Sequence, residues 1–330
     1  MVAAELGNVE RMRSLLSATK QYQMTDDWLT QSDRKGRTPL HLASIWGYKD
    51  VVGFIVEEII EEINDDVKKQ HYLNFKDKKG RTPLFHAVAE DRLEVARILV
   101  EKGADLEAST NDNHIEPGST PLMACAEKNN KQGFDFLLRS GADLEATRKD
   151  GSDAAYIACR YGHSGIIEMI AEKGKLDDIV NRPTFRGRTL MMTAALHGHG
   201  HLCKFLVEKH GASIDHQDND KCTALIFASN MGHLELVKWM VVAGAKMTVR
   251  DSSGKTALKY ADENGNEEVA KCLRAFQGVS AKENGNTNAN LKTAVKTKSV
   301  VPSRKVENTK DHKISKLQPM KQQPMKKISR

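Results

Sequence analysis

The 330-residue sequence is poor in aromatic side chains, which make up 5% of it, and it has no apolar run long enough to span a membrane. Its five cysteines are an odd number and lie far apart, so their spacing indicates no disulfide framework. No secretory signal pattern is recognisable at the N-terminus either. We therefore expect a soluble, non-transmembrane protein of a reducing compartment, the cytoplasm or alternatively the nucleus.

The sequence also lacks the usual marks of catalysis. It contains neither of the glycine motifs that bind nucleotide phosphates, G-x-x-x-x-G-K-[ST] and G-x-G-x-x-G. The tract His197-Gly-His199-Gly-His201 resembles a metal site, but no Cys or carboxylate lies beside it at a zinc-ligand spacing. The acidic run at residues 57–66 is typical of a solvated helix face. We expect no enzyme activity, no catalytic residue, no cofactor and no metal.

Charge is unevenly distributed along the chain. The net charge is +6, but residues 279–330 alone hold 13 Lys/Arg against 3 Asp/Glu and no aromatic residue. A segment of this composition cannot bury enough apolar surface to fold, so we expect a disordered basic tail. Three roles are open for it: contact with a polyanion, nuclear import, or a solvated spacer. Without aromatic residues for base stacking, no specific nucleic-acid readout is expected.

The main positive feature is a repeated phrase. GRTPLHLASIWGY begins at Gly36, GRTPLFHAVAED at Gly80 and GSTPLMACAEKN at Gly118, and weaker copies begin at residues 151, 187, 221 and 254. In each copy a turn with Gly precedes Thr, where a helix N-cap belongs, and in the first three copies Pro follows at the first helical position. Small residues then fill the first helix, a second Gly ends it, and a second helix with apolar residues at three-and-four spacing follows.

This phrase and its spacing of about 33 residues resemble the ankyrin repeat. The resemblance implies an all-α repeat solenoid: an ankyrin-type stack of helix-turn-helix units with β-hairpin fingers, followed by the disordered tail. We count seven full repeats and an N-terminal half repeat over residues 1–278. Residues 111–119 lengthen the third finger, and Asp153-Ala154 and Leu190 depart from the Thr-Pro pattern.

In this family, partners usually bind on the concave side. We use the name palm for the two residues just before the second Gly of each repeat, which the family places on that side. The candidate palm contacts are Ile45, Trp46, Arg160, Tyr161, Leu196, His197, Asn230 and Met231. Trp, Tyr and Arg are enriched among binding hot spots. The alternative is that Trp46 packs on a neighbouring hairpin and covers the core.

The finger turns before each Thr are basic in several repeats. The candidate finger contacts are Arg34, Lys35, Arg37, Lys78, Lys79, Arg81, Arg186 and Arg188. Basic fingers beside a partly apolar palm suit an extended or helical partner segment with acidic groups. Alternatively, the Arg of GRTPL is a family residue kept for solubility.

These features predict a non-catalytic adaptor or scaffold that binds a protein partner on the concave face, with the tail as a second electrostatic contact. A regulatory inhibitor that masks a partner's active or DNA-contacting surface is the alternative. A polyanion-binding or nucleic-acid-binding protein acting through the tail is a third. The identity of the partner is not encoded in the scaffold.

Overall fold

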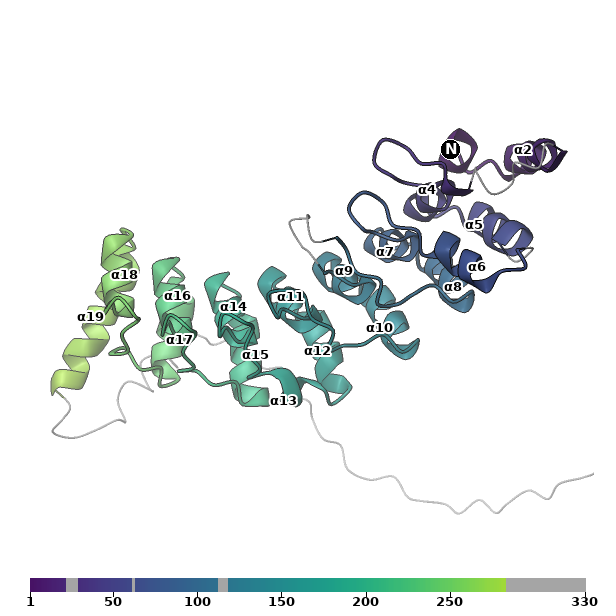
Figure 1. The fold of residues 1–330 in the computed structure, drawn as a ribbon. Coiled ribbons are helices and arrows are strands. Elements are labelled where there is room, and N and C mark those ends of the chain that lie inside the picture. Colours follow the sequence, from purple (N-terminus) through teal and green to yellow (C-terminus); the bar gives the residue numbers. More distant parts are fainter. Residues whose placement is uncertain (22–28, 61–62, 112–117, 283–330) are drawn as a thin grey trace, which may run out of the picture. The chain divides into compact units, whose positions relative to one another are not determined.

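The computed structural model describes residues 1–21, 29–60, 63–111 and 118–282, and consecutive helix pairs lie side by side in it (Figure 1). The first helices of the seven full repeats are α4 (Pro39–Trp46), α7 (Pro83–Ala89), α9 (Pro121–Lys128), α11 (Ala154–Tyr161), α14 (Leu190–Leu196), α16 (Ala224–Asn230) and α18 (Ala257–Glu263). The second helices are α5 (Lys49–Ile55), α8 (Leu93–Glu101), α10 (Lys131–Arg139), α12 (Ser164–Glu172), α15 (Gly200–His210), α17 (Leu234–Val242) and α19 (Glu267–Lys282).

The predicted helix signals act as expected. The side chain of Thr at the N-cap accepts a hydrogen bond from the backbone N–H three residues later, as in Thr82 with Phe85 at 3.2 Å. In the fourth repeat, where Asp153 replaces the Thr, the Asp153 side chain accepts a hydrogen bond from the N–H of Tyr156 at 2.8 Å and caps α11 in the same way. At the other end, Gly47 has a φ of 79°. This left-handed conformation ends α4 and is the one that glycine adopts without strain.

The core is continuous along the stack. Each first helix packs on the first helices of the neighbouring repeats, from α4 on α7 through to α16 on α18, and on the second helix of its own repeat. The contact positions are small and fully buried, as at Ala43, Ala87 and Ala194. Larger side chains such as Leu84 and Phe134 are buried between the helix layers. Each repeat therefore depends on its neighbours to bury its apolar faces, as in other repeat proteins.

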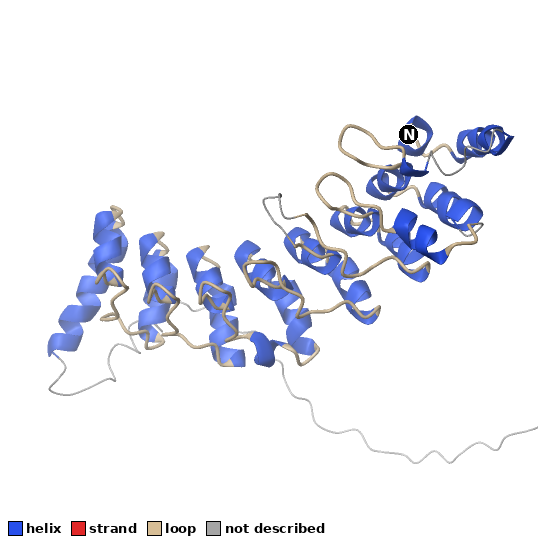
Figure 2. Cartoon of the chain, viewed as in Figure 1, coloured by secondary structure: helices blue, strands red, loops and turns tan. Residues whose placement is uncertain are grey.

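The fingers differ from the prediction of β-hairpins. Within the described residues no strand is present, and the fingers are loops (Figure 2). Successive fingers are joined by single backbone hydrogen bonds, for example from the N–H of Lys78 to the carbonyl of Lys35 at 3.0 Å. The turn itself is closed by a side chain: Asp77 accepts from the N–H groups of Lys79 and Arg81 at 2.8 and 2.9 Å. A single hydrogen bond between successive fingers does not provide the repeated backbone pairing of a β-sheet, so no sheet forms.

The stack carries additional helices that the repeat pattern did not predict. After α5 the chain forms a π-helix, η1 (Val56–Ile60), and then α6 (Asp66–Leu73), and a short α13 (Leu176–Ile179) follows α12.

At the N-terminal end, α1 (Val2–Glu5) packs on α4 and α2 (Val9–Gln21) on α5. These two helices agree with an opening repeat that lacks a finger.

At the C-terminal end, α19 continues to Lys282, four residues beyond the expected limit of 278. The rest of the predicted tail and most of the lengthened third finger, residues 283–330 and 112–117, lie outside the described residues.

Candidate functional site

The predicted palm residues all lie at the C-terminal ends of first helices. Ile45 and Trp46 end α4, and Arg160 and Tyr161 end α11. Leu196 and Asn230 are the last residues of α14 and α16, and His197 and Met231 directly follow them as C-caps. The structure thus gives these pairs one common register along the stack.

A ladder of side chains fixes the backbone beneath the palm. His163, at the start of α12, forms a hydrogen bond through Nε2 with the carbonyl of Glu127 at 3.0 Å. His199 and His233 make the same contact, at 3.1 Å each, with the carbonyls of Arg160 and Leu196. In the last repeat the side-chain amide of Asn266 replaces the imidazole and donates to two carbonyls of the preceding repeat, including that of Asn230. We call these three histidines and Asn266 the ladder.

The ladder explains the histidine tract. His199 is one of its members and follows Gly198, as His163 follows Gly162 and His233 follows Gly232. His197 is exposed and its ring stacks on that of His199, with 6.3 Å between ring centres. Within the described residues, no group of three or more His, Cys, Asp or Glu side chains is arranged to hold a metal ion.

The palm carries three exposed large apolar side chains. Trp46 is 51% exposed, Tyr161 40% and Met231 52%. Half of the Trp46 side chain therefore remains uncovered in this structure. Ile45, Leu196 and Asn230 are half-buried between these positions and the core. Apolar side chains of this size on one register are a feature of interaction surfaces.

Tyr161 is held in place by its neighbours. Its ring is stacked on that of His163, with 5.9 Å between centres and 14° between planes. The guanidinium of Arg160 lies over the Tyr161 ring at 5.6 Å, in the geometry of a cation–π contact. His163 is itself fixed by its hydrogen bond to the carbonyl of Glu127, so the ring of Tyr161 packs on an ordered side chain. Tyr161 therefore loses little conformational freedom when a partner covers it.

The predicted finger residues fall into two groups. Arg34, Lys35, Lys78, Lys79 and Arg186 are exposed at the turns. The other three are half-buried and contact carboxylates of the fingers: Arg37 lies on Asp33, Arg81 on Asp77, and Arg188 lies 3.6 Å from Asp218.

This second group shapes the fingers themselves. Arg188 also covers the ring of Phe227, 4.9 Å from its centre. The Arg of the repeated phrase therefore has a structural contact, which solubility alone would not require.

Sequence reasoning missed Phe185, which at 72% exposure is the most exposed aromatic side chain among the described residues. Its backbone N–H donates to the carbonyl of Asp150 in the preceding finger at 3.0 Å, and its ring lies against Gly151. The signal was available, because Phe185 occupies the turn position where Arg34 and Lys78 stand in repeats 1 and 2.

A buried polar cluster joins the first two repeats. His41 receives the N–H of Thr38 at Nδ1 (3.1 Å), and its Nε2 bonds with the carbonyl of Arg81 (3.0 Å). The neighbouring His86 contacts Asp77 at 3.0 Å. Burial, with the nearby imidazole of His86, lowers the pKa of His41 to about 4. His41 thus links the first helix of repeat 1 to the finger of repeat 2.

Buried thiols and the buried imidazoles offer no accessible nucleophile or base. Burial raises the pKa of Cys203 to about 12 and raises the pKa of Cys159 as well, so both thiols stay protonated at neutral pH. Burial also lowers the pKa of His86, and the ring is enclosed between the first two repeats. These groups serve packing rather than chemistry at the surface.

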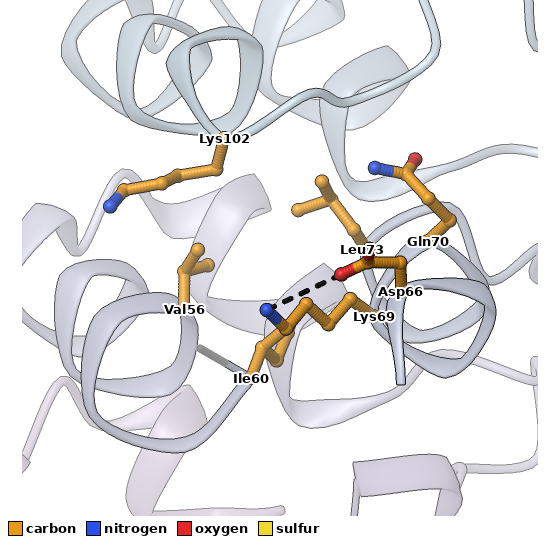
Figure 3. A pocket seen from close by; sticks show the side chains of 7 residues that line it. All are labelled: Val56, Ile60, Asp66, Lys69, Gln70, Leu73 and Lys102. Atoms are coloured by element: carbon orange, nitrogen blue, oxygen red, sulfur yellow. Dashed lines mark ion pairs between the residues drawn. The ribbon is translucent and has the colours of Figure 1, made fainter. Parts of the chain in front are cut away.

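Two neighbouring repeats also enclose a small pocket, shown in Figure 3. It lies between η1, α6 and Lys102 at the end of α8, and its volume is about 240 Å³. Its apolar lining, Val56, Ile60 and Leu73, is already buried, and Lys69 lies 3.5 Å from Asp66. A ligand would therefore gain little apolar contact there, and we place the candidate site on the palm and fingers.

Comparison with known proteins defines the class to which this geometry belongs. A family model for ankyrin repeats in three copies matches residues 57–148, 122–218, 174–251 and 191–285, and a single ankyrin-repeat model matches residues 35–65. The chain belongs to the ankyrin-repeat family. Ankyrin repeats generally mediate protein–protein interactions, which fits a surface built from exposed side chains at the ends of the first helices.

Individual relatives match over only a small part of their own length. The mouse ankyrin repeat and SAM domain-containing protein 6 is 36% identical over 31% of this chain and 11% of its own length. The Caenorhabditis elegans poly(ADP-ribose) polymerase tankyrase is 34% identical over 68% of this chain and 10% of its own. Ankyrin repeat protein nuc-2 of Neurospora crassa is 25% identical over 74% and 18%. The chain thus spans less than a fifth of each of these relatives.

One further property concerns membranes. Among the described helices, none combines the length and the apolar character needed to cross a bilayer.

Proposed function

We propose that this chain is a non-catalytic adaptor that binds a protein partner on the palm and fingers of its repeats. The observation that supports this most is the common register of Trp46, Tyr161 and Met231 at the ends of their first helices, each large, apolar and exposed. A monomeric soluble repeat protein gains nothing from exposing such side chains in one row, whereas a binding surface does.

The exposed finger residues extend the proposed surface. Arg34, Lys35, Lys78 and Lys79 add positive charge at the turns of the first two repeats. Charge at the edge of an interface chiefly steers the encounter and selects the partner's charge. An acidic partner segment is therefore favoured over a basic one. The predicted second contact through the tail, residues 279–330, lies outside the described residues from residue 283 onward. It stays a prediction, as does a cytoplasmic or nuclear location.

The alternative function is a regulatory inhibitor that masks a partner's active or DNA-contacting surface. An inhibitor would use the same palm, so the structure of the palm does not distinguish an inhibitor from an adaptor. A measurement of partner activity separates them: an adaptor leaves it unchanged and an inhibitor lowers it.

The test is affinity purification under mild salt with the full chain, residues 1–278, and the full chain carrying Trp46→Ala and Tyr161→Ala. We expect the first two to recover the same partners and the double variant to lose them while its circular dichroism stays unchanged. The matched control is Val67→Ala with Val242→Ala, which removes two exposed apolar side chains away from the palm. If the palm variant keeps every partner and the shortened chain loses them, the palm is not the binding surface.

A further inference from the structure

Apolar side chains occur on the palm of three consecutive repeats, 4 to 6. Tyr161 ends α11 and Met231 caps α16, both exposed at the second palm position, and the half-buried Leu196 ends α14 at the first palm position. In repeats 2 and 3 the same positions hold Ala89 with Glu90, and Glu127 with Lys128. Trp46 is thus separated from the cluster by two polar repeats.

Two exposed arginines lie in the same three repeats. Arg160 is exposed next to Tyr161, and Arg186 is exposed on the finger of repeat 5. Burial lowers the pKa of His197, and the nearby guanidinium groups of Arg160 and Arg188 lower it further. Asp218 lies 3.6 Å from Arg188. A negatively charged ligand group would relieve this accumulation of positive charge.

The ladder makes this surface rigid. His199 and His233 bond the carbonyls of Arg160 and Leu196, so the backbone beneath the cluster is fixed from the following repeat. The ring of Tyr161 rests on His163. Rigid aromatic anchors on a fixed backbone are the groups that contribute most to binding, because little entropy is lost on ordering them.

We propose that repeats 4 to 6 form an anchor site for a partner segment that combines an apolar side chain with neighbouring carboxylates. This inference rests on the proposed function and names the chemistry of the partner. The apolar side chain covers Tyr161, Leu196 and Met231, and the carboxylates face Arg160 and Arg186. Phe185, on the same finger as Arg186, gives the segment a second apolar contact. Trp46 lies outside this site.

The experiment is selection of peptides from a random phage-displayed library on the full chain, followed by affinity measurement with fluorescein-labelled copies of the enriched peptides. We expect the enriched peptides to pair Asp or Glu with an aliphatic or aromatic residue. Tyr161→Ala with Met231→Ala should weaken them at least about tenfold, the effect of losing one good contact. Replacing the peptide carboxylates by amides should weaken them by a similar factor, and so should Arg160→Gln with Arg186→Gln.

Two control variants and one palm variant outside the anchor site, Trp46→Ala, locate the binding. Val67→Ala removes an exposed apolar side chain on α6, and Lys204→Gln removes an exposed charge on α15, so both should leave affinity unchanged. If only Trp46→Ala weakens the peptides, the anchor site is wrong but the palm keeps its proposed function. If no peptide is enriched, or if the enriched peptides lack acidic residues, the proposed partner chemistry is wrong. If all palm variants bind alike, both proposals fail.

Discussion

Repeats 1 and 2 and repeats 4 to 6 use the same scaffold to present different surfaces. In the first region the fingers follow the repeated phrase closely: Asp33 and Asp77 close the turns, and their tips are exposed Arg and Lys. In repeats 4 and 5 Arg148 and Thr184 stand at the Asp positions and Phe185 is at a tip, whereas repeat 6 keeps Asp218 there. The palm of these repeats holds Tyr161, Leu196 and Met231 beside Arg160 and His197. The comparison teaches that departure from the phrase is where this chain differentiates its surface, while the helix layers below stay alike.

The largest expected effect tests whether the two regions share one core. Leu84 and Leu225 hold the same slot, two residues after the N-cap Thr, and both are fully buried. Leu84→Ala and Leu225→Ala should each lower the free energy of unfolding by about 2–5 kcal/mol, because each removes packing and leaves a cavity. Urea denaturation followed by circular dichroism measures this. A loss under about 1 kcal/mol in one region only would show that its helix layers are packed less tightly.

The second prediction separates the regions by pH. His41 is held neutral by burial, with its pKa lowered to about 4, and in the unfolded chain it takes a proton near pH 6.5. Stability from this group is therefore complete above pH 6.5 and is lost as the pH falls to 4, by about 3 kcal/mol. Protonation would also put a hydrogen on Nδ1, which accepts the N–H of Thr38.

Amide hydrogen exchange at pH 7 and pH 4.5 checks this prediction. We expect acidification to lower the protection factors, which compare exchange with the intrinsic rate at the same pH, far more in α4 and α7 than in α14 and α16. His41→Asn removes the titrating group and should shrink this difference, leaving the part due to His86, whose pKa is also lowered by burial. An equal loss of protection along the whole stack would contradict a localised effect.

The third prediction, with the smallest expected effect, concerns the ladder in repeats 4 to 6. Gly162 and Gly174 have φ values of 74° and 67°, so alanine is strained at both, at a cost of about 1–2 kcal/mol. A Cβ at Gly162 would also lie 2.5 Å from the ring of His199, whereas a Cβ at Gly174 meets nothing within 4 Å. Gly162→Ala should therefore cost about 1 kcal/mol more than Gly174→Ala, the value of a lost hydrogen bond.

The matched glycine pair makes this difference measurable by denaturant unfolding of the two variants. Backbone strain is common to both, so the excess reports the contact with His199 alone. Equal losses in the two variants would mean that the His199 ring moves aside without losing its bond to Arg160.

Much of the fold was predictable because its signals are local. Thr, Pro and Gly act on the backbone within a few residues of their own position, so the caps of α4, α7 and α9 follow from the sequence. The lack of strands was not predictable, since it depends on how closely successive fingers approach. Helix α6 was also missed: its region is polar, with an N-cap at Asp65 that the repeat pattern did not point to.

The positions of the palm residues were predictable, but their surroundings were not. The resemblance placed Tyr161 and Met231 at the correct helix ends. That Arg37, Arg81 and Arg188 contact carboxylates, and that Phe185 is exposed, depends on the folding of each turn. The charge and hydropathy of a residue type do not determine which neighbouring residue a long side chain contacts in the folded protein.

The ladder has a consequence for how this surface can change over generations. Its imidazoles bond to the main-chain carbonyls of Glu127, Arg160 and Leu196 and make no demand on what those residues carry as side chains. Substitutions at these positions leave the link between repeats intact. Selection on partner choice is thereby decoupled from selection on folding, and the stack can acquire a new specificity one side chain at a time.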